Sequence, residues 1–378
     1  MVFAPIGSVV DYEQPTPFIV KSARYSDSYT TPVLTAGQSF ILGNTDEIFG
    51  IYPASKSNPV IIFDDFTGAF KWVDFPFKVK SSAMKILRQN RSGTLLRYVF
   101  HVMGHLNLTS NEHKRLWISR YSLIMIPVPP LEVQREIVRI LDNFTELTAE
   151  LTAELTAELT ARKKQYEFYR DRLFADIDRK YLKPLGSFAS IRRGGNFQKK
   201  DFVDDGRPCI HYGQIYTHFG VHSDRALKFL NDDVFNASKK AQKGDIVMAV
   251  TSENVEDVCK CVAWLGDEEI AVSGHTAIIN HNVNAKYLSY FFHSSSFFAQ
   301  KVKLAHGTKV IEVTPDRLLN IMVPVPPLTE QEGIARVLDS FDSLVNGLAN
   351  GIPGEIERRQ KQYEFYRDKL LSFGERRQ

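Results

Sequence analysis

The chain has 378 residues, 43% of them hydrophobic and 24% charged, which is a globular composition with room for two domains of common size. A net charge of only +3 does not indicate a nucleic-acid partner, so such a partner has to be sought in local clusters. The three cysteines argue against a disulfide framework, and the sequence has neither a signal-peptide pattern nor a run of about 18 apolar residues. We therefore expect a cytoplasmic protein without membrane contact.

The first segment, residues 1–123, is predicted to be a mixed α/β domain. A strand-like run, PVIIF, occupies residues 59–63 between residues typical of turns. Two basic clusters with polar and aromatic neighbours follow, KVKSSAMKILRQNR at 78–91 and HKRLW at 113–117. Since Lys and Arg suit phosphates and polar side chains can read base edges, this segment is a candidate DNA-binding domain.

The second segment, residues 124–177, is predicted to be one long helix. Two prolines disfavour a helix immediately upstream of Leu131, and apolar residues then recur at spacings of three and four, as on a helix that packs against another helix. The phrase TAEL repeats within residues 147–159 and keeps this spacing. Roughly 45 residues from Leu131 would form a rod of about 65 to 70 Å. The apolar positions expected on its packed face include Ile137, Ile140, Leu141, Phe144, Leu147 and Leu151.

The third segment, residues 178–320, is predicted to be a second mixed α/β domain. Strand-like runs at 245–250 and 276–280 precede an aromatic, helix-like stretch at 286–302. Basic and polar clusters occur at IRRGGNFQKK (191–200) and IHYGQIYTHFG (210–220), and in the second cluster polar and aromatic residues alternate as in a half-buried strand.

The fourth segment, residues 321–378, repeats the second. Residues 124–144 and 321–341 are identical at 13 of 21 positions, and residues 162–173 and 359–370 at 10 of 12, both at an offset of 197 residues. Thr329 and Glu332 have the spacing of a capping box. Gly351, Pro353 and Gly354 align with the TAEL run, so we expect the second helix to break there and to restart with Pro353 as its first residue. Two rods of equal length predict an antiparallel pair.

These features together resemble the specificity subunit of type I restriction-modification systems, HsdS, in the group that carries TAEL repeats. The resemblance rests on the twin IPVPPL and QYEFYRD blocks, on the TAEL run, and on the IRRGGNFQKKDFVDDGRPCIHYG opening of the third segment. It covers essentially the whole chain. The first segment opens differently, with YEQPTPFIVKSARY at 12–25, so the two variable segments should read different DNA sequences.

The resemblance implies an α+β fold, with two mixed α/β target-recognition domains separated by an antiparallel pair of long helices in a pseudo-twofold internal repeat. The expected boundaries are 1–123 for the first recognition domain, 124–177 for the first helical spacer, 178–320 for the second domain and 321–378 for the second spacer. It also implies double-stranded DNA, two methyltransferase (HsdM) subunits and, through them, restriction (HsdR) subunits as partners. S-adenosylmethionine, ATP and Mg would then be used by the partner subunits, and this chain would bind no cofactor.

Individual contact residues follow from the clusters. The predicted phosphate contacts are Lys80, Lys85, Lys114, Arg115, Arg192, Arg193, Lys199, Lys200 and Lys309. The candidate base readers are Ser82, His211, Tyr212, Gln214, Tyr216 and His275, although the tyrosines suit a core equally well. Aromatic residues and arginines in the near-identical helix ends are candidates for protein contact, namely Tyr166, Tyr169, Arg170, Tyr363, Tyr366 and Arg367.

Two other function classes fit less of the sequence. An enzyme would need a site for ATP or S-adenosylmethionine, but the sequence has no P-loop, no G-x-G-x-x-G after a strand and no N-P-P-[FYW]-type motif. His101 with His105, Cys259 with Cys261, and Asp64 with Asp65 each lack the remaining residues of a metal or nuclease motif. A stand-alone DNA-binding protein, or a coiled-coil scaffold without restriction partners, is the alternative, and the scaffold leaves the variable segments unexplained.

Overall fold

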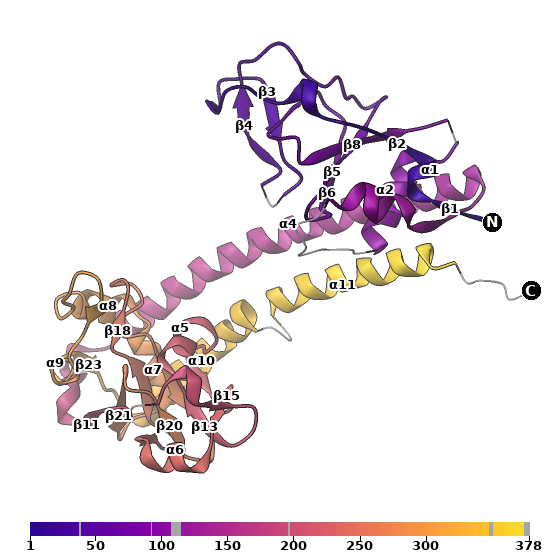
Figure 1. The fold of residues 1–378 in the computed structure, drawn as a ribbon. Helices are drawn as coiled ribbons and strands as arrows, with labels where there is room; N and C mark the ends of the chain where they lie inside the picture. The colour runs from indigo at the N-terminus through magenta and orange to yellow at the C-terminus, as the bar shows by residue number, and fades with distance from the viewer. Residues whose placement is uncertain (38, 92, 107–114, 196, 348–350, 374–378) are drawn as a thin grey trace, which may run out of the picture. The chain divides into compact units, whose positions relative to one another are not determined.

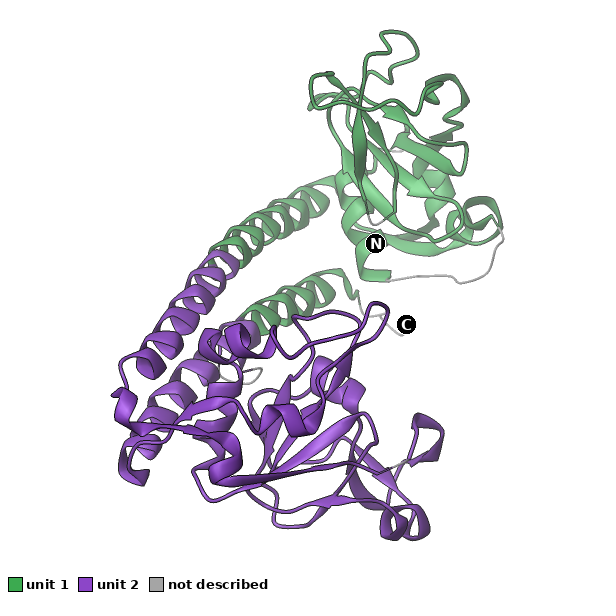
Figure 2. Ribbon diagram, turned by 90° about the vertical axis from the view of Figure 1, so that its left-hand side faces the viewer, with its two compact units in different colours: residues 1–154, 356–378 green, residues 155–355 purple. Residues whose placement is uncertain are grey.

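The computed structural model describes residues 1–37, 39–91, 93–106, 115–195, 197–347 and 351–373 (Figure 1). The chain divides into two compact units, coloured separately in Figure 2. Unit 1 comprises Met1–Glu154 and Ile356–Gln378, and unit 2 comprises Leu155–Glu355. Each unit therefore combines one variable segment with parts of both helical segments.

Unit 1 is a mixed α/β domain. Its strands are β1 (Val2–Pro5), β2 (Val10–Glu13), β3 (Thr31–Leu34), β4 (Ile41–Thr45), β5 (Val60–Asp64), β6 (Phe70–Val73), β7 (Lys78–Val79), β8 (Met84–Gln89) and β9 (Met125–Val128). Its shorter helices are α1 (Ile6–Val9), α2 (Leu96–Leu106) and α3 (Leu116–Ser119). One sheet has the strand order β2-β8-β5-β6 and is antiparallel throughout. A second sheet has the order β4-β3-β7, and β1 pairs with β9.

The core of unit 1 forms around strand β5, as the PVIIF run predicts. Val60, Ile61, Ile62 and Phe63 are all fully buried, because residues on one face of β5 pack towards α2 and those on the other pack towards β3. Helix α2 contributes Tyr98, Val99 and Val102 to the first of these clusters. The sheet is thus covered on both faces.

Unit 2 is a larger α/β domain. Its strands are β10 (Leu182–Pro184), β11 (Ala189–Arg193), β12 (Phe202–Val203), β13 (Arg207–Ile210), β14 (His222–Ser223), β15 (Lys228–Leu230), β16 (Lys240–Ala241), β17 (Ile246–Ala249), β18 (Thr251–Ser252), β19 (Cys261–Trp264), β20 (Ile270–Val272), β21 (Thr276–His281), β22 (Ile311–Glu312) and β23 (Met322–Pro324). Its shorter helices are α5 (Tyr212–Thr217), α6 (Asp232–Ala237), α7 (Ala285–Phe292), α8 (Ser295–Lys301) and α9 (Pro315–Leu318). Two five-stranded sheets have the orders β11-β21-β17-β19-β14 and β12-β15-β13-β20-β16.

The strands expected at 245–250 and 276–280 are confirmed as β17 and β21, which pair in antiparallel register at the centre of the first sheet. The aromatic stretch at 286–302 is helical, but it forms two helices. Helix α7 ends at Phe292 with His293 as its C-cap, and Ser294 caps α8, with its hydroxyl oxygen accepting a hydrogen bond from the Phe297 N–H. A serine cap of this kind starts a new helix because it satisfies a backbone donor that has no partner within the helix.

The first long helix is confirmed: α4 spans Leu131–Ala175, 45 residues. Leu151, Leu155 and Leu159 are half-buried, whereas the alanines and glutamates of the TAEL units are exposed, so the four-residue period keeps one face against a partner. Leu147 is 61% exposed and does not lie on that face, contrary to the prediction.

The second helical segment breaks as predicted. Helix α10 spans Leu328–Asn346 and α11 spans Ile352–Leu371, so Pro353 is the second helical residue of α11 and not the first. The capping box expected from Thr329 and Glu332 is absent, because the helix already begins at Leu328 behind Pro327 and no side chain caps it. Proline fixes φ in a range suited to a helix entrance, so the sequence PPL alone sets the start.

The internal repeat is visible in reciprocal contacts. In unit 1, Phe144 of α4 stacks on Tyr366 of α11, with ring centroids 5.4 Å apart. In unit 2, Tyr169 of α4 stacks on Phe341 of α10 at 5.7 Å. Phe341 and Tyr366 lie 197 residues after Phe144 and Tyr169, so the same two positions meet in each unit with the two copies exchanged. Each unit therefore contains the same local packing between the first and the second helical segment.

Each variable domain is joined to its helix by the same set of contacts. Gln134 accepts a hydrogen bond from the Leu95 N–H at 2.9 Å and donates to the Pro129 carbonyl at 2.8 Å. Its counterpart Gln331 accepts from the Asn284 N–H at 2.9 Å and donates to the Pro326 carbonyl at 2.7 Å. Both glutamines are buried, so each fixes the angle at which a domain meets its helix.

A carboxylate adds a second joint at equivalent positions. Asp142 accepts from Arg97 at 2.8 Å and is hydrogen-bonded to His101 at 2.7 Å, and Asp339 accepts from Lys286 at 2.7 Å and from the Tyr290 hydroxyl at 2.8 Å.

Of the helices in the described part of the chain, none combines the length and apolar character needed to cross a membrane.

Candidate nucleic-acid interface

Residues 212–217 of unit 2 form helix α5 and not the strand predicted from their alternating pattern. His211 is the residue before the helix. Its Nδ1 accepts a hydrogen bond from the Gly213 N–H at 3.2 Å, and its own N–H donates to Gln214 Oε1 at 2.8 Å. These two bonds are a reciprocal cap, in which histidine takes the place usually held by Ser, Thr, Asp or Asn.

The capping role bears on two candidate base readers. His211 is 6% exposed, and burial, with smaller effects from Lys199 and His275, lowers the pKa of its imidazole to about 4. The ring is therefore uncharged at neutral pH and its Nδ1 is occupied, which corrects the expectation that His211 faces DNA. Gln214 is half-buried, and its Oε1 accepts the His211 N–H. Base reading by Gln214 stays a prediction.

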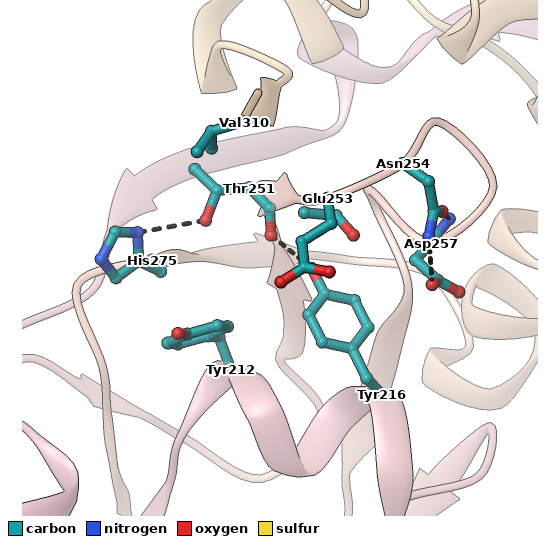
Figure 3. Close-up of a pocket in the computed structure, with 9 residues that line it drawn as sticks. Tyr212, Tyr216, Thr251, Glu253, Asn254, Asp257, His275 and Val310 are labelled. Carbon is teal, nitrogen blue, oxygen red and sulfur yellow. Dashed lines mark hydrogen bonds between the residues drawn. The ribbon is translucent and has the colours of Figure 1, made fainter. Parts of the chain in front are cut away.

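Three other candidates converge on one cavity of about 340 Å³ (Figure 3). Tyr212 and Tyr216 contribute from α5, and His275 contributes from the turn before β21, with its ring centroid 5.0 Å from that of Tyr212. His275 Nδ1 is hydrogen-bonded to Thr251 Oγ1 at 3.1 Å, and the Tyr216 hydroxyl donates to the Thr251 carbonyl. Burial raises the pKa of Tyr216, so its hydroxyl stays protonated.

Sequence reasoning missed the other residues that line this cavity. They come from β18, from the turn that follows it and from the residue before β22, namely Thr251, Ser252, Glu253, Asn254, Asp257 and Val310. The segment that contains SEN at 252–254 was not singled out because it has no basic residue. Only the pairing of β18 with β22 and the packing of α5 bring these positions together.

The glycine pair of the RRGG motif explains how the strand with the basic residues approaches this region. A Cβ on Gly194 would lie 2.1 Å from the Ser273 carbonyl oxygen, so only glycine fits there. The Gly194 N–H donates to the Thr276 carbonyl and the Gly195 N–H to the Val272 carbonyl. These bonds anchor β11 against the turn that carries His275.

The predicted phosphate contacts of unit 2 are all exposed. Arg192 donates to the Lys240 carbonyl at 2.7 Å, and Arg193 pairs with Glu312, whereas Lys199 and Lys200 lie in a short 3-10 turn at Lys199–Asp201. Lys309 precedes Val310 of the cavity wall. Both arginines are therefore held in place by neighbours, as suits groups that position a ligand.

In unit 1, Lys80, Ser82 and Arg115 are exposed, and Lys114 lies outside the described residues. The prediction that Lys85 contacts a phosphate is wrong. The Lys85 side chain is 1% exposed and its ammonium lies 3.2 Å from the Asp65 carboxylate, which also accepts the Trp117 N–H. A buried, paired ammonium cannot reach a phosphate, so Lys85 is a structural residue.

The six residues predicted to contact a partner protein are used mainly within the chain. Tyr169 and Tyr366 stack on phenylalanines of the neighbouring helices, Tyr166 is buried, and the Tyr363 hydroxyl is hydrogen-bonded to Thr145 at 3.2 Å. Arg170 and Arg367 pair with Asp171 and Asp368, the residues that follow them.

Tyr169 and Tyr366 are nevertheless partly accessible, at 40% and 37% exposure, and each is preceded by an aromatic residue that is more exposed. Phe168 and Phe365 are 59% and 62% exposed and lie 197 residues apart, at the same position of the two copies. Sequence analysis did not single them out, although an aromatic residue retained in both copies was the available signal.

The residues considered for other chemistry serve structural roles. His101 is buried and bonded to Asp142, His105 is bonded to Asp368, and all three cysteines are buried and free. Asp64 accepts two backbone N–H groups of a turn, from Phe66 and Thr67. Within the described ranges, no group of three or more His, Cys, Asp or Glu side chains is placed to hold a metal ion.

Comparison with known proteins supplies the remaining evidence. A family model for the type I restriction modification DNA specificity domain matches residues 2–161 and 181–358. The specificity subunit of the type I restriction enzyme EcoR124I/EcoR124II from Escherichia coli is 40% identical over 389 residues, covering 98% of this chain and 93% of that protein. The MjaVIII specificity subunit from Methanocaldococcus jannaschii is 25% identical and covers 66% of this chain and 60% of that protein.

A solved structure has the same fold. It comes from work on complex assembly and conformational transition of the type I restriction-modification system, and it covers 96% of this chain and 97% of its own with a TM-score of 0.62 and 17% identity.

Proposed function

The chain belongs to the family of type I restriction-modification DNA specificity subunits, and we propose that it reads a split, asymmetric target through its two variable domains. The recognition domains in this proposal are residues 1–123 and 178–320, joined by helical spacers at 124–177 and 321–378. The observation that carries the proposal is the exchange of equivalent contacts, Phe144 with Tyr366 and Tyr169 with Phe341. Because both units repeat the same helix contacts with the two copies exchanged, each variable domain would read one half-site of the duplex.

The two half-sites should differ because the two domains differ. Unit 1 presents Lys80 and Ser82 from the connection between β7 and β8 and Arg115 from the residue before α3, whereas unit 2 presents a cavity beside α5 and a basic strand, β11. Two surfaces of unlike chemistry would not select the same bases, since base identity is read by donor and acceptor placement. The bases between the half-sites would be spanned without being read.

The repeat also supports two equivalent docking sites for methyltransferase (HsdM) subunits. Phe168 and Phe365 are exposed aromatic residues at matching positions, each followed by a tyrosine that is stacked within the chain. Exposed aromatics on a rigid helix are the residue type that dominates protein interfaces. Each copy would then hold one methyltransferase subunit, and the restriction (HsdR) subunits would join through the assembled complex.

Chemistry in this proposal belongs to the partners. S-adenosylmethionine would be bound by the methyltransferase subunits, and ATP and Mg would be used within the assembled enzyme. This chain would supply sequence recognition and geometry. This chain would therefore have no catalytic role, and the purified chain should not transfer methyl groups.

The partner proposal is tested by the mass of the complex formed with an excess of methyltransferase subunit. Two methyltransferase subunits per chain are expected, Phe168→Ala and Phe365→Ala should each weaken the binding of one of them, and the double variant should weaken both. Leu227→Ala removes an exposed apolar side chain of a variable domain and serves as control. A saturated complex of one to one would contradict the proposal, and undiminished binding by the double variant would overturn the assignment of the two phenylalanines.

A further inference from the structure

The cavity beside α5 is lined by an acidic residue, Glu253, whose carboxylate has no partner among the residues that the structure describes. Its walls are two tyrosines of α5, the end of β18 with the turn after it, His275 and Val310 (Figure 3). In the view of Figure 3, the Glu253 side chain lies between His275 on one side and Asn254 on the other.

The other polar side chains of the cavity are largely committed. The Thr251 hydroxyl is hydrogen-bonded to His275 Nδ1, and the Tyr216 hydroxyl donates to the Thr251 backbone carbonyl. Asn254 donates to the Asp257 carboxylate at 2.9 Å and accepts the Asp257 N–H at 2.7 Å, and Asp257 also pairs with Lys260 at 2.6 Å. In the part of the chain that the structure describes, no hydrogen bond or ion pair engages the exposed Glu253 carboxylate.

The charge of Glu253 is unexpected at this position. Arg193 is bonded to Glu312, whose backbone pairs with Thr251 of the cavity wall, and Lys309 precedes Val310. Among the described residues, no Lys or Arg lines the cavity itself, and a free carboxylate there would repel a phosphate. A carboxylate accepts hydrogen bonds but does not donate them, so its ligand must present a donor.

DNA presents few such donors. In the major groove they are the exocyclic amino groups of cytosine (N4) and adenine (N6), and acidic side chains are suited to accept from them. The flat faces of Tyr212 and His275 border the same cavity and can contact an adjacent base or a thymine methyl group.

We propose that Glu253 accepts a hydrogen bond from the exocyclic amino group of one adenine or cytosine in the half-site read by unit 2, and so determines the base at that position. The inference rests on the proposed function and adds the residue and the base chemistry. Loss of one good base contact corresponds to about a 5- to 150-fold loss of discrimination at one position.

The test measures equilibrium binding of the complex with its methyltransferase subunits to duplexes that carry every single-base change of the unit 2 half-site. Glu253→Ala should lose discrimination at one position only, by the factor given above. Glu253→Gln, which keeps the side-chain volume, should lose less because its amide oxygen still accepts. Glu256→Gln removes an exposed carboxylate three residues away, outside the cavity, and should bind as the unchanged complex does.

Base analogues then identify the amino group. A duplex with purine in place of the adenine lacks N6, and one with 2-pyrimidinone in place of the cytosine lacks N4. One of the two should weaken binding by the unchanged complex and have no further effect on Glu253→Ala.

Unchanged discrimination in Glu253→Ala, or tighter binding to all sequences with the preference intact, would overturn the inference and leave the proposed function standing. Failure of the unchanged complex to prefer any sequence would instead refute the proposed function.

Discussion

Deleting one TAEL unit, residues 148–151, should shorten the spacer of the recognised DNA target by one base pair and leave both half-sites unchanged. Helix α4 is continuous from Leu131 to Ala175 and passes from unit 1 into unit 2 within the repeat, so a deletion there alters the register between the two ends of one helix. Four residues correspond to about 6 Å of rise and about 400° of rotation, which is a net turn of about 40°.

One base-pair step of B-DNA has a rotation similar to the net turn of one TAEL unit. B-DNA rises about 3.4 Å per base pair and turns once in about 10.5 base pairs, or about 34° per base pair. The net turn therefore matches one base pair, while the rise falls somewhat under two. We expect the rotation, and not the rise, to determine the change in spacer length. A recognition surface that is rotated away from its groove loses its contacts with the bases. A helix that is tilted relative to the DNA axis, in contrast, projects only part of its length along that axis.

The packed face of α4 should survive the deletion. Leu155 moves into the place of Leu151 and Leu159 into that of Leu155, and all three are half-buried now. Removing four residues is the reverse of a stutter and is locally tolerated. Deleting only residues 148–150 turns the downstream helix by about 60° in the other direction, moves the leucines off the packed face and should abolish specific methylation.

The assay is methylome sequencing of cells that carry each variant with the methyltransferase subunit. An added TAEL unit should lengthen the spacer by one base pair, and Glu150→Gln, which keeps the length and changes an exposed side chain, should leave it unchanged. A deletion variant that keeps the spacer and reads different bases would refute the reasoning.

Three further predictions concern named side chains. Lys85→Met should destabilise unit 1 by about 3–5 kcal/mol because it leaves the Asp65 carboxylate buried and without its cation. Lys200→Ala should instead reduce the slope of the logarithm of the DNA-binding constant against the logarithm of the salt concentration by about 0.9, with little effect on unfolding. The reverse pattern in denaturation and binding titrations would contradict both assignments. Gln134→Ala and Gln331→Ala should each lower the unfolding free energy by about 1–3 kcal/mol in chemical denaturation, compared with less than about 0.5 kcal/mol for Gln360→Ala, which changes an exposed residue. Equal losses in all three variants would show that the buried glutamines do not hold the domains on their helices. Burial opposes ionisation of Asp339, but hydrogen bonds from His222, Lys286 and Tyr290 outweigh it and lower the pKa of its carboxyl to about 2, below the ordinary value of 3.8. The stability that this carboxylate contributes is therefore present above about pH 4 and is lost as the pH falls towards 2. Asp339→Asn should flatten the dependence of the unfolding free energy on pH in that window, and an unchanged slope would count against these hydrogen bonds.

The long helices could be predicted from sequence because their signals are local and repeated. Proline pairs set the two starts, apolar spacing set the packed face, and Gly351 with Pro353 set the break. The same spacing misplaced Leu147, since the exposed and buried edges of a helix depend on where its partner runs.

The candidate site was harder to predict because its residues depend on distant partners. Lys85 became structural through Asp65, twenty residues earlier, and nothing near Lys85 in the sequence indicated that pairing. Histidine is an unusual helix cap, so the alternation of residues 211–216 predicted a strand where His211 starts a helix. Basic clusters in the sequence do not indicate Glu253, because base reading also uses hydrogen-bond acceptors, which such clusters lack.

Methylome sequencing of a host that carries this chain with its methyltransferase subunit tests the central claim most directly. We expect one motif that depends on this chain, with two unlike half-sites, an unread spacer of fixed length and a methylated adenine in each half. A palindromic motif, a single continuous motif, or no motif that disappears when the chain is removed would contradict it.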